Sequence, residues 1–180
     1  MKELLVIGGG GHGRIIAEAV AQTGLYRVIG FGDDDPRKRG VRIDELIVLG
    51  PWSHINADAY IVAIGNNEMR RVVFERLVSA QKSVATIIHP RACVSQLATV
   101  GLGTVVLAGA VIQAGARLSE NVIVNVGVVV DHDAQVGSHA HLAVSSTVVS
   151  FGRIASGEVL APGTVRLREG SAGVDQSRPL

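Results

Sequence analysis

The hydrophobic pattern divides the chain into two parts with different periods. Residues 1–88 alternate short apolar runs with segments in which apolar residues recur every three to four positions. The apolar runs predict three buried parallel strands, at 3–8, 26–35 and 59–67. The periodic segments predict two amphipathic helices, at 14–24 and 68–81. This alternation of strands and helices predicts an α/β domain with a short parallel sheet covered by helices.

The second predicted helix has a recognisable apolar side. Its apolar residues fall at helical spacing, at Met69, Val72, Val73 and Leu77. Side chains at this spacing share one face of a helix, so we expect that face to pack on the sheet.

From Ala92 onward the period changes to six residues. Twelve consecutive sixth positions carry branched aliphatic residues: Val94, Val100, Val106, Ile112, Leu118, Val124, Val130, Val136, Leu142, Val148, Ile154 and Leu160. The residues two places before them are nearly all small. A six-residue period fits neither an α-helix nor an array of hairpins, and it is the signature of a parallel β-helix. We expect each aliphatic side chain to point inward and each small residue to form a corner.

Composition agrees with this picture and excludes several classes of protein. Apolar residues make up 47% of the 180 residues, aromatic residues only 3%, and there are 22 glycines, which suits thin, repetitive packing. The net charge of +1 and the absence of a basic run argue against nucleic-acid or anionic-membrane partners. No stretch reaches the roughly 20 apolar residues of a membrane span. The start, MKELLVIGGGGHG, lacks a signal-peptide cleavage site, so we expect a cytoplasmic protein.

The single cysteine, Cys93, excludes a disulfide framework and a cysteine-based zinc site. Its neighbours Ala92 and Val94 are apolar, so we expect it to be a small buried residue.

The segment 8–13 contains the pattern G-x-G-x-x-G between a predicted strand and a predicted helix. Glycines there allow a tight turn and let backbone N–H groups approach a phosphate at the helix N-terminus. Asp33, Asp34 and Asp35 follow the second strand, where a dinucleotide fold places a ribose-binding acid. Taken alone, this predicts a dinucleotide site. The alternative is a turn that needs glycine only for packing, followed by a solvated acidic loop. The domain has room for about one nucleotide.

Residues 132–141, HDAQVGSHAH, hold three of the six histidines. As a metal site, the cluster would resemble the zinc centres of γ-class carbonic anhydrases, but the glycine-turn domain has no counterpart in that family. A solvated polar edge is the second interpretation, for His139 above all. The third is acyl transfer, with His132 as a general base near neutral pH and Asp133 fixing its tautomer.

Four motifs occur together and in a fixed order: VIGGGGHGRIIAEA, GFGDDD, VAIGNNEMRR and VVDHDAQVGSHAHLA. With the hexapeptide stretch, they resemble the hexapeptide-repeat sugar O-acyltransferase family. That family is related to sialic acid O-acetyltransferases and includes N-acetyltransferases of nucleotide-linked 4-amino-4,6-dideoxy sugars. The resemblance implies a left-handed β-helix after a Rossmann-like half domain, and a homotrimer in which His132 faces a neighbour.

The resemblance also implies an activity and a set of site residues. Acetyl would move from acetyl-CoA to the amino group of the nucleotide-linked sugar, with His132 as general base and Asp133 orienting it, and with no metal. His141, and the backbone at Ser150, would bind acetyl-CoA. The residues that would bind the nucleotide-sugar are Gly10, Gly11, His12, Asp33, Asp34, Asn66 and Asn125.

After His141 the sequence departs from the family pattern. Ser145 and Ser150 stand where glycines are expected near the thioester, and the hexads stop at Arg166. We therefore expect three segments: a nucleotide-sugar-binding domain at 1–88, a β-helix at 89–167 and a polar tail at 168–180. Two alternatives remain open, an O-acetyltransferase of a sialic-acid-like sugar and a catalytically diminished homologue that only binds sugar-nucleotide.

Overall fold

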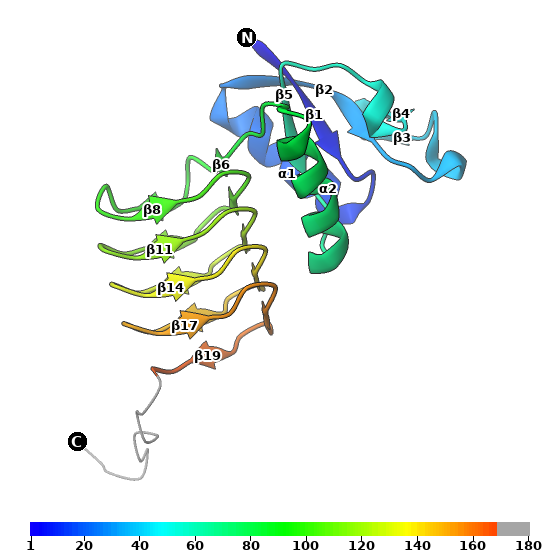
Figure 1. Ribbon diagram of the computed structural model, residues 1–180. Coiled ribbons are helices and arrows are strands. Elements are labelled where there is room, and N and C mark those ends of the chain that lie inside the picture. The colour runs from blue at the N-terminus through cyan, green and yellow to red at the C-terminus, as the bar shows by residue number, and fades with distance from the viewer. Residues whose placement is uncertain (169–180) are drawn as a thin grey trace, which may run out of the picture.

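The computed structural model describes residues 1–168 and shows an α/β domain followed by a β-helix (Figure 1). The α/β domain has one five-stranded sheet with the order β3-β4-β2-β1-β5. Its strands are β1 (Lys2–Ile7), β2 (Tyr26–Gly32), β3 (Arg42–Ile43), β4 (Leu46–Gly50) and β5 (Ala59–Val62). Its helices are α1 (Gly11–Thr23) and α2 (Asn67–Ser79), with short 3-10 turns at Pro36–Lys38 and Trp52–His54. The three predicted parallel strands and two predicted helices are confirmed.

The β3–β4 hairpin is an addition that the prediction missed. β4 pairs in parallel with β2, and β3 pairs antiparallel with β4 at the edge of the sheet. The turn between them contains Asp44 in the left-handed region, with φ of 50°. The hairpin extends the sheet beside the acidic loop that follows β2.

The β-helix consists of two-residue strands stacked in three parallel sheets, which we name faces 1, 2 and 3. Face 1 contains β6 (Ile87–Ile88), β9 (Val105–Val106), β12 (Ile123–Val124), β15 (His141–Leu142) and β18 (Val159–Leu160). Face 2 contains β7 (Cys93–Val94), β10 (Val111–Ile112), β13 (Val129–Val130), β16 (Thr147–Val148) and β19 (Val165–Arg166). Face 3 contains β8 (Thr99–Val100), β11 (Arg117–Leu118), β14 (Gln135–Val136) and β17 (Arg153–Ile154).

Three hexads make one coil, because each strand pairs with the strand 18 residues later, as Val111 does with Val129. The predicted inward aliphatic residues from Val106 to Leu160 form one buried cluster together with the small corner residues. The six-residue period therefore gives a parallel β-helix with three faces, as predicted.

One prediction about burial is wrong, and a second holds only in part. Cys93 is exposed, because it precedes the inward Val94 and alternate residues of a strand point to opposite sides. On α2, the buried residues are Arg70, Phe74 and Leu77, whereas Met69 is 60% exposed. The apolar pattern placed Leu77 on the buried face but missed its centre, where a buried arginine lies.

The α/β domain packs directly on the β-helix. Ala17 and Val20 of α1 share a buried cluster with Ile87, Val105 and Leu107 of the first coils. The predicted division at residue 88 stays a prediction, although Ile87 already pairs in face 1. Arg166 occupies an inward position of the last described coil and forms an ion pair with Glu158. The predicted polar tail lies, apart from Arg168, outside the described residues. No helix within residues 1–168 is long and apolar enough to cross a membrane.

Candidate active site

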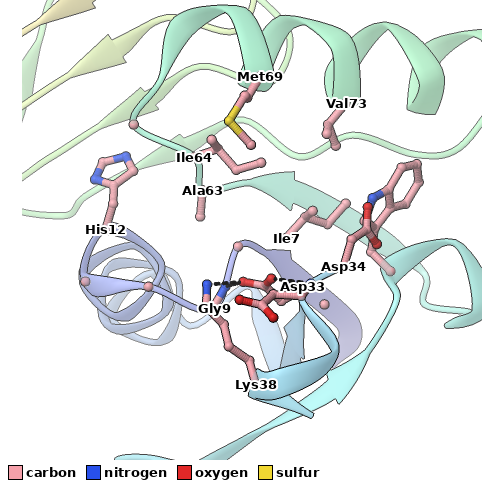
Figure 2. A pocket seen from close by; sticks show the side chains of 17 residues that line it. Ile7, Gly9, His12, Asp33, Asp34, Lys38, Ala63, Ile64, Met69 and Val73 are labelled. Carbon is pink, nitrogen blue, oxygen red and sulfur yellow. Dashed lines mark hydrogen bonds and ion pairs between the residues drawn. The ribbon is translucent and has the colours of Figure 1, made fainter. Parts of the chain in front are cut away.

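A cavity of about 540 Å³ opens at the carboxyl ends of β1, β2 and β5 (Figure 2). The glycine turn and the acidic loop form one side, and the segment from Ala63 to Gly65 forms another. The carboxyl edge of a parallel sheet is the usual ligand-binding edge of such folds, because loops and helix N-termini converge there.

The glycines of the turn fall into two groups. A Cβ at Gly13 would lie 1.9 Å from the carbonyl oxygen of Gly8, and a Cβ at Gly9 would meet Val48, so close packing requires glycine at both. A Cβ at Gly10 or Gly11 would meet nothing within 4 Å. Packing alone therefore explains part of the turn, and the open side at Gly10 and Gly11 leaves space for a ligand.

The turn leads into α1 without a side-chain cap. Gly10 is the N-cap residue, and the first turn of the helix contains no acidic residue. The first N–H groups of a helix have no partner within it and favour an anion. This end of α1 lines the cavity, where a phosphate would supply the missing acceptor.

Two of the predicted acidic residues have different surroundings. One oxygen of Asp33 accepts hydrogen bonds from the backbone N of Gly9 at 2.9 Å and from Nζ of Lys38 at 2.7 Å. Burial alone would raise the pKa of Asp33, but these bonds and one from the Asp35 backbone hold it below its usual value. Asp33 is thus engaged in fixing the glycine turn, as Figure 2 shows. Asp34 is exposed and lines the cavity, so its carboxylate is accessible to a ligand.

His12 connects the cavity to the β-helix. Its ring lies 6.3 Å from the ring of His141, centroid to centroid, and its buried Nε2 has no hydrogen-bond partner among the described residues. Burial, and then the nearby His141 and Arg70, lower the pKa of His12 to about 4. The unpartnered nitrogen of this neutral imidazole is therefore an unsatisfied buried polar group next to the β-helix.

His141 and Asn125 lie together beside His12. Nδ2 of Asn125 is 3.4 Å from Nε2 of His141. Burial, followed by the charge of Arg70, lowers the pKa of His141, while a hydrogen bond to the Gly65 backbone opposes the decrease. The structure thus brings together His12, Asn125 and His141, three residues that the sequence predicted.

His132 lies elsewhere on the coil, at the corner between faces 2 and 3. Its Nδ1 is 2.9 Å from Oδ2 of Asp133, and both side chains are 50% exposed. The hydrogen bond with Asp133 raises the pKa of His132 above its ordinary value. Ser150 is 18 residues later and stacks one coil beyond His132, so it also lies at this corner and not beside His141. The ring of Phe151 meets that of His132 edge-on, with 5.4 Å between centroids.

His139 and Asn66 both have hydrogen-bond partners within the fold. His139 is buried, with Nδ1 2.8 Å from Nδ2 of Asn121, and packs edge-on against Phe74, so the solvated edge expected for it is wrong. Asn66 caps α2 by accepting a hydrogen bond from the Met69 backbone at 2.9 Å. Its assignment to the nucleotide-sugar stays a prediction.

Sequence reasoning missed Lys38, Arg70 and Phe151. Lys38 lies in the same loop as Asp33, in the 3-10 turn that follows it, and this closeness in sequence could have suggested the ion pair. Nothing in the local sequence indicates the burial of Arg70 or the contact of Phe151 with His132. Within residues 1–168, no group of three or more His, Cys, Asp or Glu side chains is placed to hold a metal ion.

Comparison with known proteins finds a matching family and a related enzyme. Residues 3–77 match the family described as the PglD N-terminal domain. The chain is 33% identical over 123 residues to UDP-N-acetylbacillosamine N-acetyltransferase from Bacillus subtilis, an alignment that covers 60% of this chain and 52% of the relative. The match therefore spans about half the length of that curated relative.

Two solved structures resemble the whole fold. The acetyltransferase domain of PglB from Neisseria gonorrhoeae, in complex with acetyl coenzyme A, is 31% identical with a TM-score of 0.70, over 91% of this chain and 92% of that one. A mutant of perosamine N-acetyltransferase from Caulobacter crescentus, in complex with CoA and GDP-perosamine, is 26% identical with a TM-score of 0.80, over 92% of this chain and 89% of that one.

Proposed function

The chain belongs to the hexapeptide-repeat sugar acyltransferase family with a PglD-type N-terminal domain, and we propose that it transfers acetyl from acetyl-CoA to the amino group of a nucleotide-linked 4-amino-4,6-dideoxy sugar. The observation that carries this proposal is the contact of His12 with His141. It joins a cavity suited to a nucleotide diphosphate to the β-helix, which carries the residues expected for acetyl transfer.

The nucleotide part of the substrate binds at the glycine turn. The diphosphate accepts hydrogen bonds from the free N–H groups at the start of α1, where Gly10 and Gly11 leave room. Asp34 contacts the ribose or base, while Asp33 holds the turn in place. The sugar then extends towards His12, which lines the cavity on the side of the β-helix.

His132 is the general base of the transfer. Its Nδ1 is held by Asp133, which leaves Nε2 free to accept a proton from the sugar amine. As the proton leaves, the amine nitrogen attacks the thioester carbonyl carbon and the carbon–sulfur bond breaks. The products are an N-acetyl amide and CoA, whose thiolate takes the proton from His132. The ring of His141 and the backbone at Ser150 bind acetyl-CoA, and Asn125 binds the sugar.

We further propose that the active unit is a homotrimer. Within one chain, His132 lies at the corner between faces 2 and 3, whereas His12, Asn125 and His141 gather at face 1. A second copy packed against the β-helix would bring its own His132 to the His141 of its neighbour, and a closed ring of three such contacts satisfies every copy. The partly exposed Val111 and Val129 on face 2 supply apolar surface for this packing. Because nucleotide-sugars and acetyl-CoA are cytoplasmic metabolites, we propose that the reaction takes place in the cytoplasm.

The proposal is tested by incubating the protein with acetyl-CoA and a panel of acceptors. The panel contains UDP- and GDP-linked 4-amino-4,6-dideoxy sugars and a sialic acid, and the readouts are CoA thiol release and product mass. We expect one nucleotide-linked amino sugar to gain an acetyl group that resists mild base, as an amide does. A base-labile product on the sialic acid would instead support O-acetylation. Nucleotide-sugar binding without CoA release from any acceptor would identify a diminished homologue.

A further inference from the structure

Helix α2 lies along one corner of the β-helix, the corner between faces 3 and 1. Successive coils place residues in the left-handed region there: Gly103, Asn121, His139 and Gly157, with φ of 70°, 55°, 62° and 71°. The carbonyl groups of Asn121, His139 and Gly157 accept hydrogen bonds from α2, so the corner presents a column of acceptors.

Three side chains of α2 contact this column along the length of the helix. Nδ2 of Asn67 donates to the Gly157 carbonyl at 2.9 Å, and the ring of Phe74 fills the space where a Cβ on Gly103 would lie, 2.6 Å away. Between them, Arg70 contacts the two middle coils. The helix rises about 5.4 Å per turn and the coils repeat about every 4.8 Å, so the two spacings nearly match.

Arg70 is the centre of this contact. It is 1% exposed. On the corner, its guanidinium donates to the carbonyl oxygens of His139 at 2.6 Å, Ala140 at 3.2 Å and Asn121 at 3.2 Å. On the other side, it donates to the carbonyl oxygens of Ile64 at 3.1 Å and Gly65 at 3.3 Å. A further bond reaches Oδ1 of Asn67 at 2.7 Å.

This arrangement is a costly way to join two domains. Burial lowers the pKa of Arg70 to about 10, which leaves it charged at neutral pH, and none of its hydrogen-bond acceptors within residues 1–168 is a carboxylate. A hydrophobic side chain of similar volume would avoid the cost of burying a charge, but it would leave these carbonyl groups without donors. An apolar residue would also lack the planar guanidinium, which donates hydrogen bonds to carbonyl groups of two segments at once.

Both segments belong to the candidate active site. Ile64 and Gly65 line the nucleotide cavity, and Ala140 immediately precedes His141. We propose that Arg70 is a positioning residue for the transfer: it locks the cavity loop to the β-helix corner, so that the sugar and the acetyl group meet at a fixed distance. This inference rests on the proposed function. Arg70 itself touches neither the cavity's ligand space nor the reacting atoms.

The test compares Arg70→Lys with Arg71→Lys, its matched control. Arg71 is the next residue of α2, but its side chain is 41% exposed and pairs with Glu68 and Glu75. Lysine keeps the charge of Arg70 and loses the fork. We expect kcat of R70K to fall on the order of 10- to 100-fold, because misplacement of reacting groups acts on the chemical step. KM for the nucleotide-sugar should stay within about threefold, and R71K should retain both constants. A kcat for folded R70K within about twofold of the wild-type value overturns the proposal.

A second measurement does not depend on catalysis. The groups that face His12 are His141 and Arg70, and those that face His141 are His12, Arg70 and the Gly65 backbone. In Arg70→Met, NMR titration should show the pKa values of both histidines rising, whereas Arg71→Met should leave them unchanged. Unmoved values in folded R70M contradict the placement of Arg70, whether or not the wild-type protein transfers acetyl. Should either Arg70 variant not fold, Asn67→Ala removes one acceptor of Arg70 and should lower kcat by about three- to tenfold, while an unchanged kcat overturns the proposal.

Discussion

The rings of His12 and His141 lie 6.3 Å apart and are tilted by 35°, one from the glycine-turn helix and the other from face 1 of the β-helix. Burial and neighbouring positive groups lower the pKa of both, that of His12 to about 4. His132 has the opposite shift, because its hydrogen bond to Asp133 raises its pKa. Of these three histidines, His132 is therefore the one whose pKa is shifted upward, towards neutral pH.

The pH dependence of the reaction follows from this difference. A base acts when deprotonated, so kcat/KM should rise with pH and reach half its maximum above pH 6.5. Asp133→Asn removes the main cause of the raised pKa, so the half-maximum should move to lower pH. Asp131→Asn should cause a smaller shift in the same direction, because Asp131 acts on the His132 imidazole through its charge and its hydrogen bond is to the His132 backbone. A half-maximum that stays in place in D133N would contradict the assignment of the base.

His12 should make the protein sensitive to acid. Its pKa is about 4 in the folded state and about 6.5 in the unfolded chain, so the unfolded state binds more protons between these values. The free energy of unfolding should consequently fall as pH decreases from about 6.5 to 4. His12→Gln should show a shallower decrease, measured by urea unfolding at several pH values. Equal slopes for the two proteins would mean that His12 is not held neutral.

Replacement of His132 should affect the chemical step alone. We expect His132→Ala to lower kcat on the order of 10²- to 10⁴-fold, since that is the usual contribution of a general base. Its proposed role is to accept a proton and not to hold the nucleotide, so calorimetric affinity for the nucleotide-sugar should stay near the wild-type value. His54→Ala, at an exposed position in the Trp52–His54 turn, is the matched control and should keep full activity. Unchanged turnover in H132A would remove His132 from the mechanism.

The two groups of glycines give a sharper test of the cavity. Gly11→Ala adds a methyl group in open space, so the melting temperature should hold while nucleotide-sugar affinity falls by about tenfold or more. Gly13→Ala forces a Cβ against the Gly8 carbonyl and should lower stability by about 1–3 kcal/mol. Thermal shift with and without nucleotide-sugar distinguishes the two effects. If G11A bound nucleotide-sugar normally, the turn would serve packing alone.

The sequence predicted the β-helix well because every coil repeats the same physical requirement. An inward aliphatic residue every six positions, from Val94 to Leu160, leaves no other regular structure to choose. The sequence also predicted the glycine turn. Only the folded structure shows that Gly13 is required for packing whereas Gly11 faces open space. The β3–β4 hairpin escaped prediction because its strands are short and one of them is at the edge.

Proximity in sequence was misleading for the histidines. His132, His139 and His141 occupy ten residues, but a three-sided coil distributes them over one corner, a second corner and a face. Their partners come from elsewhere: Asp133 beside His132, Asn121 and Phe74 around His139, and His12 beside His141. Burial of Arg70 was beyond prediction for a similar reason, since its acceptors are carbonyl groups that only the folded corner brings together.

Mixing two inactive variants tests most directly whether the transfer site is shared between subunits. His132→Ala and His141→Ala are each expected to be inactive. The two variants carry different affinity tags, are co-expressed in equal amounts, and are purified by both tags in succession. If His132 of one subunit acts with His141 of the next, each mixed trimer contains one intact site, and the unselected mixture should recover about 25% of wild-type activity. The doubly purified fraction should recover about one third. Activity no greater than that of the separate variants would contradict a site shared between neighbours and, with it, the account given for His132.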